Sequence, residues 1–253
     1  MSNIYEALKQ AQNERQIELP VSQTPESGSV KSCLPSESSL TPTRVTMDAE
    51  MFSLYQNIEY LLPELPEKII QFIGSREGEG VSTIVRKFAR IANTRFGKRV
   101  LIMDAAHHNP TQHIYYNIKS DYGWKDVLGT GGPVNKACYM AGNTNLFLSP
   151  ISAQAALTPY IQNQHAAASL FRELKAIFDL IIIDSSPATT SPDSIAMSRF
   201  SDGVVIVLEA EKTRWQMVEN VREKITRSGG NVLGIVLNKR KFYIPESIYN
   251  HLC

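Results

Sequence analysis

Short apolar segments alternate with amphipathic ones along most of this chain. Continuous runs of Val, Ile and Leu predict buried strands, whereas apolar residues that recur every three or four positions predict helices. The strands are expected at residues 69–73, 100–103, 145–148, 180–183, 204–209 and 232–237. The helices are expected at residues 83–96, 124–128, 166–178, 193–198 and 213–228, after an earlier helix that contains Met51, Leu54, Tyr55 and Ile58 and ends before Pro63.

The predicted strands are apolar throughout, and they do not alternate between apolar and polar residues. That pattern is typical of a parallel sheet that is covered on both faces. Because strands and helices alternate along the chain, the sequence predicts an α/β domain. We expect a doubly wound, mostly parallel sheet with helices on both faces.

The N-terminal region differs in composition from this domain. Ile4, Leu8 and Ala11 recur at helical spacing, so residues 1–15 are expected to form a short helix. Residues 16–46 are rich in Pro, Ser and Thr, and they are expected to be a disordered linker because they bury too little apolar surface to order themselves. The globular domain is therefore expected at residues 47–253.

The charge balance and the cysteines exclude several classes of protein. Lys and Arg number 26 against 25 Asp and Glu, and the net charge of +1 predicts no bulk attraction to nucleic acid or anionic lipid. Cys33, Cys138 and Cys253 are far apart, which favours the reduced thiols of a cytoplasmic protein over disulfides or a zinc site. The sequence predicts neither a transmembrane segment nor a signal peptide. Any membrane contact is then expected to come through a partner.

A glycine-rich segment at residues 72–83, Phe-Ile-Gly-Ser-Arg-Glu-Gly-Glu-Gly-Val-Ser-Thr, has the features of a phosphate-binding loop. It follows a predicted strand and opens a predicted helix, which is the context that such a loop needs. Its glycines let backbone N–H groups surround an anion at the positive end of the helix, and Ser82 is placed to ligate Mg²⁺. The candidate nucleotide-binding residues of the loop are Gly78, Glu79, Gly80, Val81, Ser82 and Thr83. Val81 cannot supply the ammonium that would reach the β- and γ-phosphates, which argues against efficient phosphoryl transfer.

Polar residues also end three other predicted strands. Asp104 and Asp184 are expected near the loop, where carboxylates can hold Mg²⁺ directly or through water. Asp104 is the candidate catalytic residue if the protein is an enzyme, but an aspartate at this position can also simply cap the next turn. Asn238 is suited to hydrogen-bonding a purine edge, although it can equally be a turn residue. The adjacent His107 and His108 would point in different directions and make a poor metal pair.

Together these segments resemble the bacterial tyrosine autokinases of capsule and exopolysaccharide synthesis. That family consists of P-loop NTPases of a deviant Walker type, related to septum-site and chromosome-partitioning ATPases. Its phosphate loop, Ser-x-x-Pro-Gly-Glu-Gly-Lys-Ser-Thr, corresponds to residues 74–83. Its Asp-Ala-Asp-x-Arg-x-Pro motif corresponds to residues 104–110, and its Tyr-Asp-x-x-x-x-Asp-x-Pro-Pro motif corresponds to residues 178–187, with Ser186 in place of the first proline. The resemblance implies ATP or ADP and Mg²⁺ as cofactors.

The chain departs from the family pattern where the family carries charge. Val81 replaces the phosphate-loop lysine, Ala106 replaces the second aspartate of the Asp-x-Asp pair, and His108 stands in the arginine position. Removing one charge-stabilising group commonly costs ~10²–10³ in rate. The resemblance therefore implies a weakened kinase, unless Arg76, Lys87 or a partner's arginine restores the charge.

Two further departures concern assembly and substrate. The family's Glu-x-x-Arg-x-x-Arg segment, which helps neighbouring subunits to associate, reads Glu50-x-x-Ser53-x-x-Gln56 here. The C-terminal tyrosine cluster, which is the usual autophosphorylation target, is reduced to Tyr243 and Tyr249. A homo-oligomer is still a candidate assembly, but the family's ring is less expected.

Several functions stay open on these grounds. The leading hypothesis is a catalytically weakened autokinase homologue that regulates an inner-membrane polysaccharide co-polymerase or a related kinase from the cytoplasm. One alternative is an active ATP-dependent protein-tyrosine kinase, and another is a structural module that binds no nucleotide. A chromosome-partitioning or septum-positioning role is less favoured, because the chain also lacks the signature lysine that this branch needs early in its loop.

Overall fold

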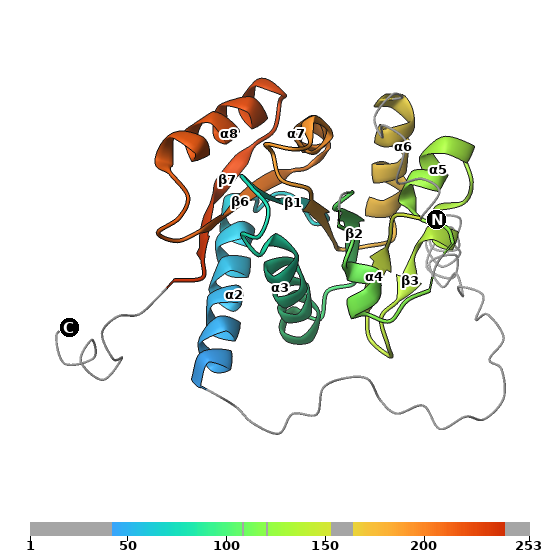
Figure 1. Ribbon diagram of the computed structural model, residues 1–253. Helices are drawn as coiled ribbons and strands as arrows, with labels where there is room; N and C mark the ends of the chain where they lie inside the picture. The colour runs from blue at the N-terminus through green and yellow to red at the C-terminus, as the bar shows by residue number, and fades with distance from the viewer. Residues whose placement is uncertain (1–41, 108, 120, 153–163, 241–253) are drawn as a thin grey trace, which may run out of the picture. The chain divides into compact units, whose positions relative to one another are not determined.

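A computed structural model describes residues 42–107, 109–119, 121–152 and 164–240 (Figure 1). In this part of the chain seven strands form one sheet in the order β3-β4-β2-β5-β1-β6-β7. The strands are β1 (Lys68–Gly74), β2 (Val100–Ala105), β3 (Tyr139–Met140), β4 (Leu146–Ser149), β5 (Leu180–Ser185), β6 (Gly203–Glu209) and β7 (Val232–Asn238). Neighbouring strands are parallel except β3 and β4. The predicted doubly wound, mostly parallel sheet is confirmed, and β3 is an addition too short for a sequence pattern to indicate.

Helices cover both faces of the sheet (Figure 1). The α-helices are α2 (Pro42–Leu61), α3 (Val81–Phe96), α4 (Gln112–Tyr115), α5 (Trp124–Thr130), α6 (Gln164–Lys175), α7 (Pro192–Met197) and α8 (Trp215–Arg227), and the 3₁₀ helices are η1 (Val134–Ala137) and η3 (Ser198–Phe200). One apolar cluster joins α2 and α3 to one face of the sheet, and another joins α7 and α8 to the opposite face. The sequence did not indicate α4, the short helix that begins with Gln112.

The ends of the expected elements differ in detail from the prediction. Helix α2 begins at Pro42, inside the range that was expected to be linker. Helix α7 begins at Pro192, one residue before its expected start, and Ser191 is its N-cap. The predicted helix at residues 1–15 lies outside the described residues. So do residues 16–41 of the predicted linker, together with Cys33, His108, Tyr243, Tyr249 and Cys253.

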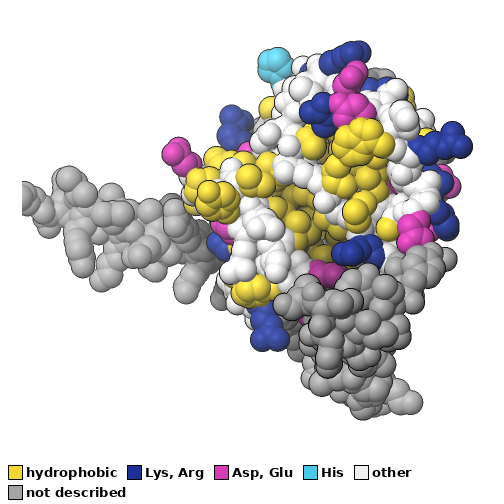
Figure 2. All heavy atoms as spheres, turned by 90° about the vertical axis from the view of Figure 1, so that its left-hand side faces the viewer, with side chains coloured by type: hydrophobic (Ala, Val, Ile, Leu, Met, Phe, Trp, Pro, Cys, Tyr) yellow, Lys and Arg dark blue, Asp and Glu magenta, His cyan; other side chains and the backbone are white. Residues whose placement is uncertain are grey.

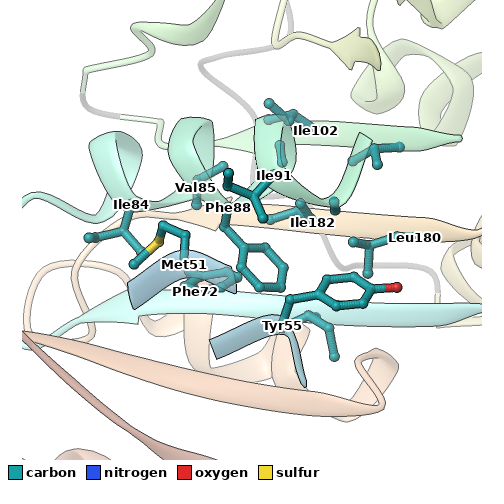
Figure 3. Close-up of a cluster of buried hydrophobic side chains, with 14 of the residues drawn as sticks. Met51, Tyr55, Phe72, Ile84, Val85, Phe88, Ile91, Ile102, Leu180 and Ile182 are labelled. Atoms are coloured by element: carbon teal, nitrogen blue, oxygen red, sulfur yellow. The ribbon is translucent and has the colours of Figure 1, made fainter. Parts of the chain in front are cut away.

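An aromatic cluster fixes α3 against the sheet (Figure 3). The ring of Phe88 on α3 lies 5.2 Å, between centroids, from that of Phe72 on β1. Tyr55 of α2 stacks on Phe96 with a centroid distance of 3.9 Å. Burying a large apolar side chain contributes roughly 1.5–3 kcal/mol. This packing fixes α3 against β1, and the phosphate loop connects these two elements.

The three central strands, β1, β2 and β5, are buried along their whole length. This explains why their sequences are apolar throughout. Their carboxyl ends meet at one edge of the sheet, where Asp104 of β2 is in register with Asp184 of β5. The sheet therefore brings together the strand ends that carry the candidate functional residues.

An apolar groove of about 340 Å³ lies between α2 and the last strand of the sheet, β7. Figure 2 shows that side of the molecule, with hydrophobic side chains gathered on it. Leu54 and Tyr60 of α2 line the groove together with Leu233 and Ile235 of β7, and Tyr60 is 84% exposed. Among the described residues, no helix is long and apolar enough to cross a bilayer.

Candidate functional site

The glycine-rich loop connects β1 to α3 and takes backbone conformations that suit glycine. Gly78 and Gly80 have φ angles of 81° and 89°, which other residues rarely adopt. Gly80 caps α3, and its carbonyl oxygen accepts hydrogen bonds from the N–H groups of Thr83 and Ile84, both at 3.1 Å. A Cβ atom at Gly80 would lie 2.3 Å from Nδ2 of Asn238. The loop therefore requires glycine at position 80, and it leaves the N-terminus of α3 facing outwards, as an anion site does.

The buried side chain of Glu79 braces this loop from within. Its Oε2 accepts hydrogen bonds from the main-chain N–H groups of Ser75 at 2.6 Å and Arg76 at 3.1 Å. Its Oε1 accepts from the hydroxyls of Ser75 at 2.7 Å and Thr213 at 2.6 Å. The Glu79 side chain thus stabilises the loop, and only its main chain is left to contact an anion.

Beside the loop lies a cavity of about 280 Å³. Its lining includes all six loop residues predicted to bind nucleotide, namely Gly78, Glu79, Gly80, Val81, Ser82 and Thr83. The opposite wall comes from the segments that follow β2 and β5, including Ala106, Asn109 and Ser186. The cavity therefore lies where a phosphate group would meet the loop and the first turn of α3.

Asn238 and Lys239 approach the loop from the end of β7. The Asn238 side chain donates a hydrogen bond to the main-chain oxygen of Glu79 at 2.9 Å. Lys239 donates from Nζ to the main-chain oxygen of Gly78 at 2.5 Å, and its Nζ lies 3.7 Å from Glu209. Asn238 therefore holds the loop in this structure, and its predicted contact with a purine remains a prediction.

The position of the missing lysine is apolar in the structure as well as in the sequence. Val81 is the first residue of α3 and packs against the apolar cluster of α2, α3 and the sheet. Among the residues that line the cavity, Arg76 carries the positive charge. Its guanidinium lies 3.9 Å from Glu79 and 3.8 Å from Glu209, so two carboxylates already offset its charge. Lys87, the other suggested replacement, is not among the lining residues.

Two buried carboxylates face each other next to the loop. Asp104 accepts hydrogen bonds from the N–H groups of Ala106 at 3.1 Å and Gln112 at 3.2 Å. The bond from Ala106 is the turn cap that was the alternative interpretation of Asp104. Asp184 accepts from Nε2 of Gln112 at 2.7 Å, while its Oδ1 has no partner. Burial, and secondly the charge of Asp184, raise the pKa of Asp104 to about 8. Burial also raises the pKa of Asp184, and the nearby Gln112 amide, Ser82 hydroxyl and Arg86 charge offset part of that rise.

These residues fit a magnesium ion. Mg²⁺ prefers hard oxygen ligands and usually takes one or two carboxylates together with water and substrate phosphates. The Ser82 hydroxyl, Asp104 and Asp184 provide such a set. Buried polar atoms normally have a hydrogen-bond partner, but Oδ1 of Asp184 is buried without one, so it is available to a metal ion. In the described part of the chain, no three His, Cys, Asp or Glu side chains gather into a site of another type.

Sequence reasoning missed two residues of this site, Gln112 and Arg86. The Gln112 side chain is fully buried and donates to Asp184 and, at 3.3 Å, to the main-chain oxygen of Ser82. Its Oε1 accepts from Nε of Arg86 at 2.9 Å. Arg86 lies one turn after Ser82 on α3, so helical spacing could have placed it on the same side of the helix. No spacing rule indicates Gln112, because it lies in a segment whose helical nature was not predicted.

Comparison with known proteins identifies the family. A family model described as an AAA domain matches residues 67–230, which is more than half of the chain. The chain belongs to this family of P-loop ATPases. It is 26% identical over 209 residues to a putative tyrosine-protein kinase CapB of Staphylococcus aureus, a match that covers 81% of this chain and 89% of CapB. It is 24% identical to the tyrosine-protein kinase YwqD of Bacillus subtilis, covering 78% of this chain and 83% of YwqD.

Solved structures agree on the fold. The chimerical protein CapA2B2 superposes with a TM-score of 0.69 at 24% identity, covering 81% of this chain and 88% of that one. The septum site-determining protein MinD of Pyrococcus horikoshii, complexed with Mg-ADP, gives a TM-score of 0.58 at 18% identity, with 74% and 77% of the two chains covered. Both likenesses concern the fold, which is that of P-loop NTPases, as the glycine loop and strand order indicate.

Proposed function

We propose that this protein is a tyrosine-kinase-like P-loop protein of capsule or exopolysaccharide biosynthesis that binds ATP or ADP with Mg²⁺ and has a weakened catalytic site. The observation that carries the proposal is the contrast at the phosphate loop. The backbone cradle keeps its glycine conformations and its bracing bonds, whereas Val81 packs against the apolar core in place of a cation. Such a site is suited to holding a diphosphate through main-chain N–H groups and poorly suited to transferring a phosphoryl group.

In this proposal Ser82, Asp104 and Asp184 hold the magnesium ion. When bound, the ion would offset the negative charge of the phosphates, which the family's lysine normally does in part. The chain's own groups have other tasks. Glu79 and Thr213 keep the loop in its shape, and Asn238 keeps the Glu79 carbonyl turned towards β7.

We infer from the relatives that the protein acts with a partner at the inner face of the membrane, as a regulatory component beside a polysaccharide co-polymerase or a related kinase. This inference is supported by one relative, the succinoglycan biosynthesis transport protein ExoP of Rhizobium meliloti, in which the match covers 23% of the ExoP chain. The exposed positions Glu50, Ser53 and Gln56 on α2 lack the arginines of the family's association segment. That difference favours a partner other than a ring of identical copies.

Titration calorimetry of ADP–Mg²⁺ and ATP–Mg²⁺ against the full chain and its Val81→Lys variant tests the proposal. We expect measurable binding of ADP to the unmodified chain and at least tenfold tighter ATP binding to the lysine variant. Val81→Met is the matched control, because it adds similar length without charge and should bind ATP like the unmodified protein. Absence of ADP binding by both the unmodified chain and the lysine variant would contradict the proposal.

A labelled-phosphate assay separates the remaining alternative, an active tyrosine kinase. Incubation of the purified chain with labelled ATP and Mg²⁺ should give little or no phosphotyrosine. Strong labelling that is lost in Asp104→Ala would instead show an active enzyme in which Asp104 is catalytic.

A further inference from the structure

Gln112 contacts both carboxylates of the proposed metal site. Its main-chain N–H donates to Oδ2 of Asp104 at 3.2 Å, and its side-chain amide donates to Oδ2 of Asp184 at 2.7 Å. Since both hydrogen bonds come from one residue, its position fixes the two carboxylates relative to each other. The side chain is completely buried, so water does not compete for these bonds.

The amide of Gln112 is itself held in one orientation. An amide can turn over and exchange its oxygen for its nitrogen, which would place Oε1 against the carboxylate of Asp184. Arg86 opposes that exchange, because its Nε donates to Oε1 at 2.9 Å. The guanidinium is fixed by a second bond to the hydroxyl of Thr111 at 2.7 Å and lies 4.4 Å from the centre of the Tyr115 ring. The arginine therefore keeps the donor side of the amide towards Asp184.

This arrangement leaves one oxygen of Asp184 available. Gln112 engages Oδ2, while the buried Oδ1 has no partner among the described residues. A buried carboxylate oxygen without a donor normally costs free energy, so such an atom indicates a place where a cation or an ordered water belongs. Gln112, Asp104 and Asp184 do not themselves line the cavity beside the loop, whereas their neighbours Ser82, Ala106 and Ser185 do. The amide of Gln112 engages Oδ2 of Asp184 and leaves Oδ1 for another ligand.

We propose that Arg86 and Gln112 act together as positioning residues that orient Asp184 and Asp104 for a divalent cation. The proposal rests on the proposed function of this site. Arg86 sets the orientation of the Gln112 amide, and the amide engages Oδ2 of Asp184, so that Oδ1 would be left to hold the ion.

Binding of Mn²⁺ to the full chain, followed by the electron paramagnetic resonance of free Mn²⁺, tests this proposal. Gln112→Met keeps the length of the side chain but removes the donor, and we expect Mn²⁺ binding about 10–100-fold weaker, the loss typical for residues that orient metal ligands. Arg86→Met should weaken binding roughly threefold, since the amide then becomes free to turn over. Arg90→Met is the matched control, because Arg90 lies one turn further along α3 and pairs with Asp48 of α2, and this variant should bind Mn²⁺ as the unmodified chain does.

Two further measurements make the outcomes distinct. The melting temperature of each variant shows whether it is folded, and Arg86→Met serves alone if Gln112→Met does not fold. ADP binding in the presence of EDTA reports on the loop without metal, and it should be equal in all variants. Unchanged or tighter Mn²⁺ binding by both variants, or no binding by any chain, overturns the positioning role. Loss of ADP binding everywhere would contradict the proposed function instead, because that measurement does not depend on the metal.

Discussion

The phosphate loop and the carboxylate pair lie at the same edge of the sheet, but they are held in place in different ways. The loop presents main-chain groups, and the side chains of Glu79 and Asn238 support it through hydrogen bonds with its backbone. The carboxylate pair presents side chains that are buried close to each other, so its own charge opposes its formation. The loop can therefore survive the loss of a charged residue, whereas the pair depends on neighbours that compensate its charge.

This difference explains why Val81 leaves the fold intact. A lysine at that position acts on the phosphates and not on the loop's own hydrogen bonds. Loop geometry is set by Gly78 and Gly80 and by the bonds to Glu79. The carboxylates have no such independence, because Gln112 donates to both of them and is held in turn by Arg86.

The largest effect is expected from Gly80→Ala. The new Cβ would lie 2.3 Å from Nδ2 of Asn238 at a φ of 89°, so the loop or the end of β7 must move. We expect a loss of ~2–3 kcal/mol in the free energy of unfolding and loss of detectable ADP binding, measured by urea denaturation and calorimetry.

Gly78→Ala is the matched variant for this experiment. Gly78 has a similar φ of 81°, but a Cβ there meets nothing within 4 Å. It should cost only ~1–2 kcal/mol, the price of the left-handed conformation itself. Equal losses in the two variants would show that the contact with Asn238 does not matter.

The next effect concerns the brace of the loop, through Glu79→Gln. The new amide nitrogen replaces one carboxylate oxygen and cannot accept the hydrogen bonds which that oxygen receives. It loses either the bonds from the N–H groups of Ser75 and Arg76 or those from the hydroxyls of Ser75 and Thr213. The free energy of unfolding should fall by ~1–3 kcal/mol, as followed by urea denaturation. The exposed neighbour Glu77 provides the control, because Glu77→Gln should change stability by less than ~0.5 kcal/mol. A similar result for both variants would mean that Glu79 does not brace the loop.

The smallest effect has the opposite sign and concerns the carboxylate pair. Asp184→Asn removes one of two adjacent buried carboxylates and places an amide where Oδ1 has no partner. With EDTA present, we expect the melting temperature at pH 8 to rise by roughly 2–4 °C, the change that ~1 kcal/mol produces in a domain of this size. The same variant should lose Mn²⁺ binding, so that stability and metal binding change in opposite directions.

The pH dependence of this gain checks its cause. The pKa of Asp104 is raised from 3.8 to about 8, so the folded state binds more protons than the unfolded state between these values. The contribution of the group to stability therefore falls as the pH rises through that window, and it levels off above pH 8. The advantage of Asp184→Asn should be small at pH 4 and largest at pH 8 or above. A constant difference across this range would contradict charge repulsion as its source.

The sequence alone determined the layers of this fold and the strand ends where the site lies. Uninterrupted apolar strands indicated a buried parallel sheet, and the spacing of glycines after β1 indicated the phosphate loop, because both depend on local geometry. The same reasoning placed Asp104 and Asp184 at one edge, since parallel strands share their carboxyl ends.

Only the tertiary structure decided what holds those residues. Gln112 meets Asp184 across 72 positions of sequence, and Glu79 meets Thr213 across 134. Neither contact leaves a periodic signal, because each depends on how loops from different strands pack at the sheet edge. The side chain of Glu79 contacts its own loop because buried N–H groups need acceptors. Which acceptor lies nearest to them is known only once the chain has folded.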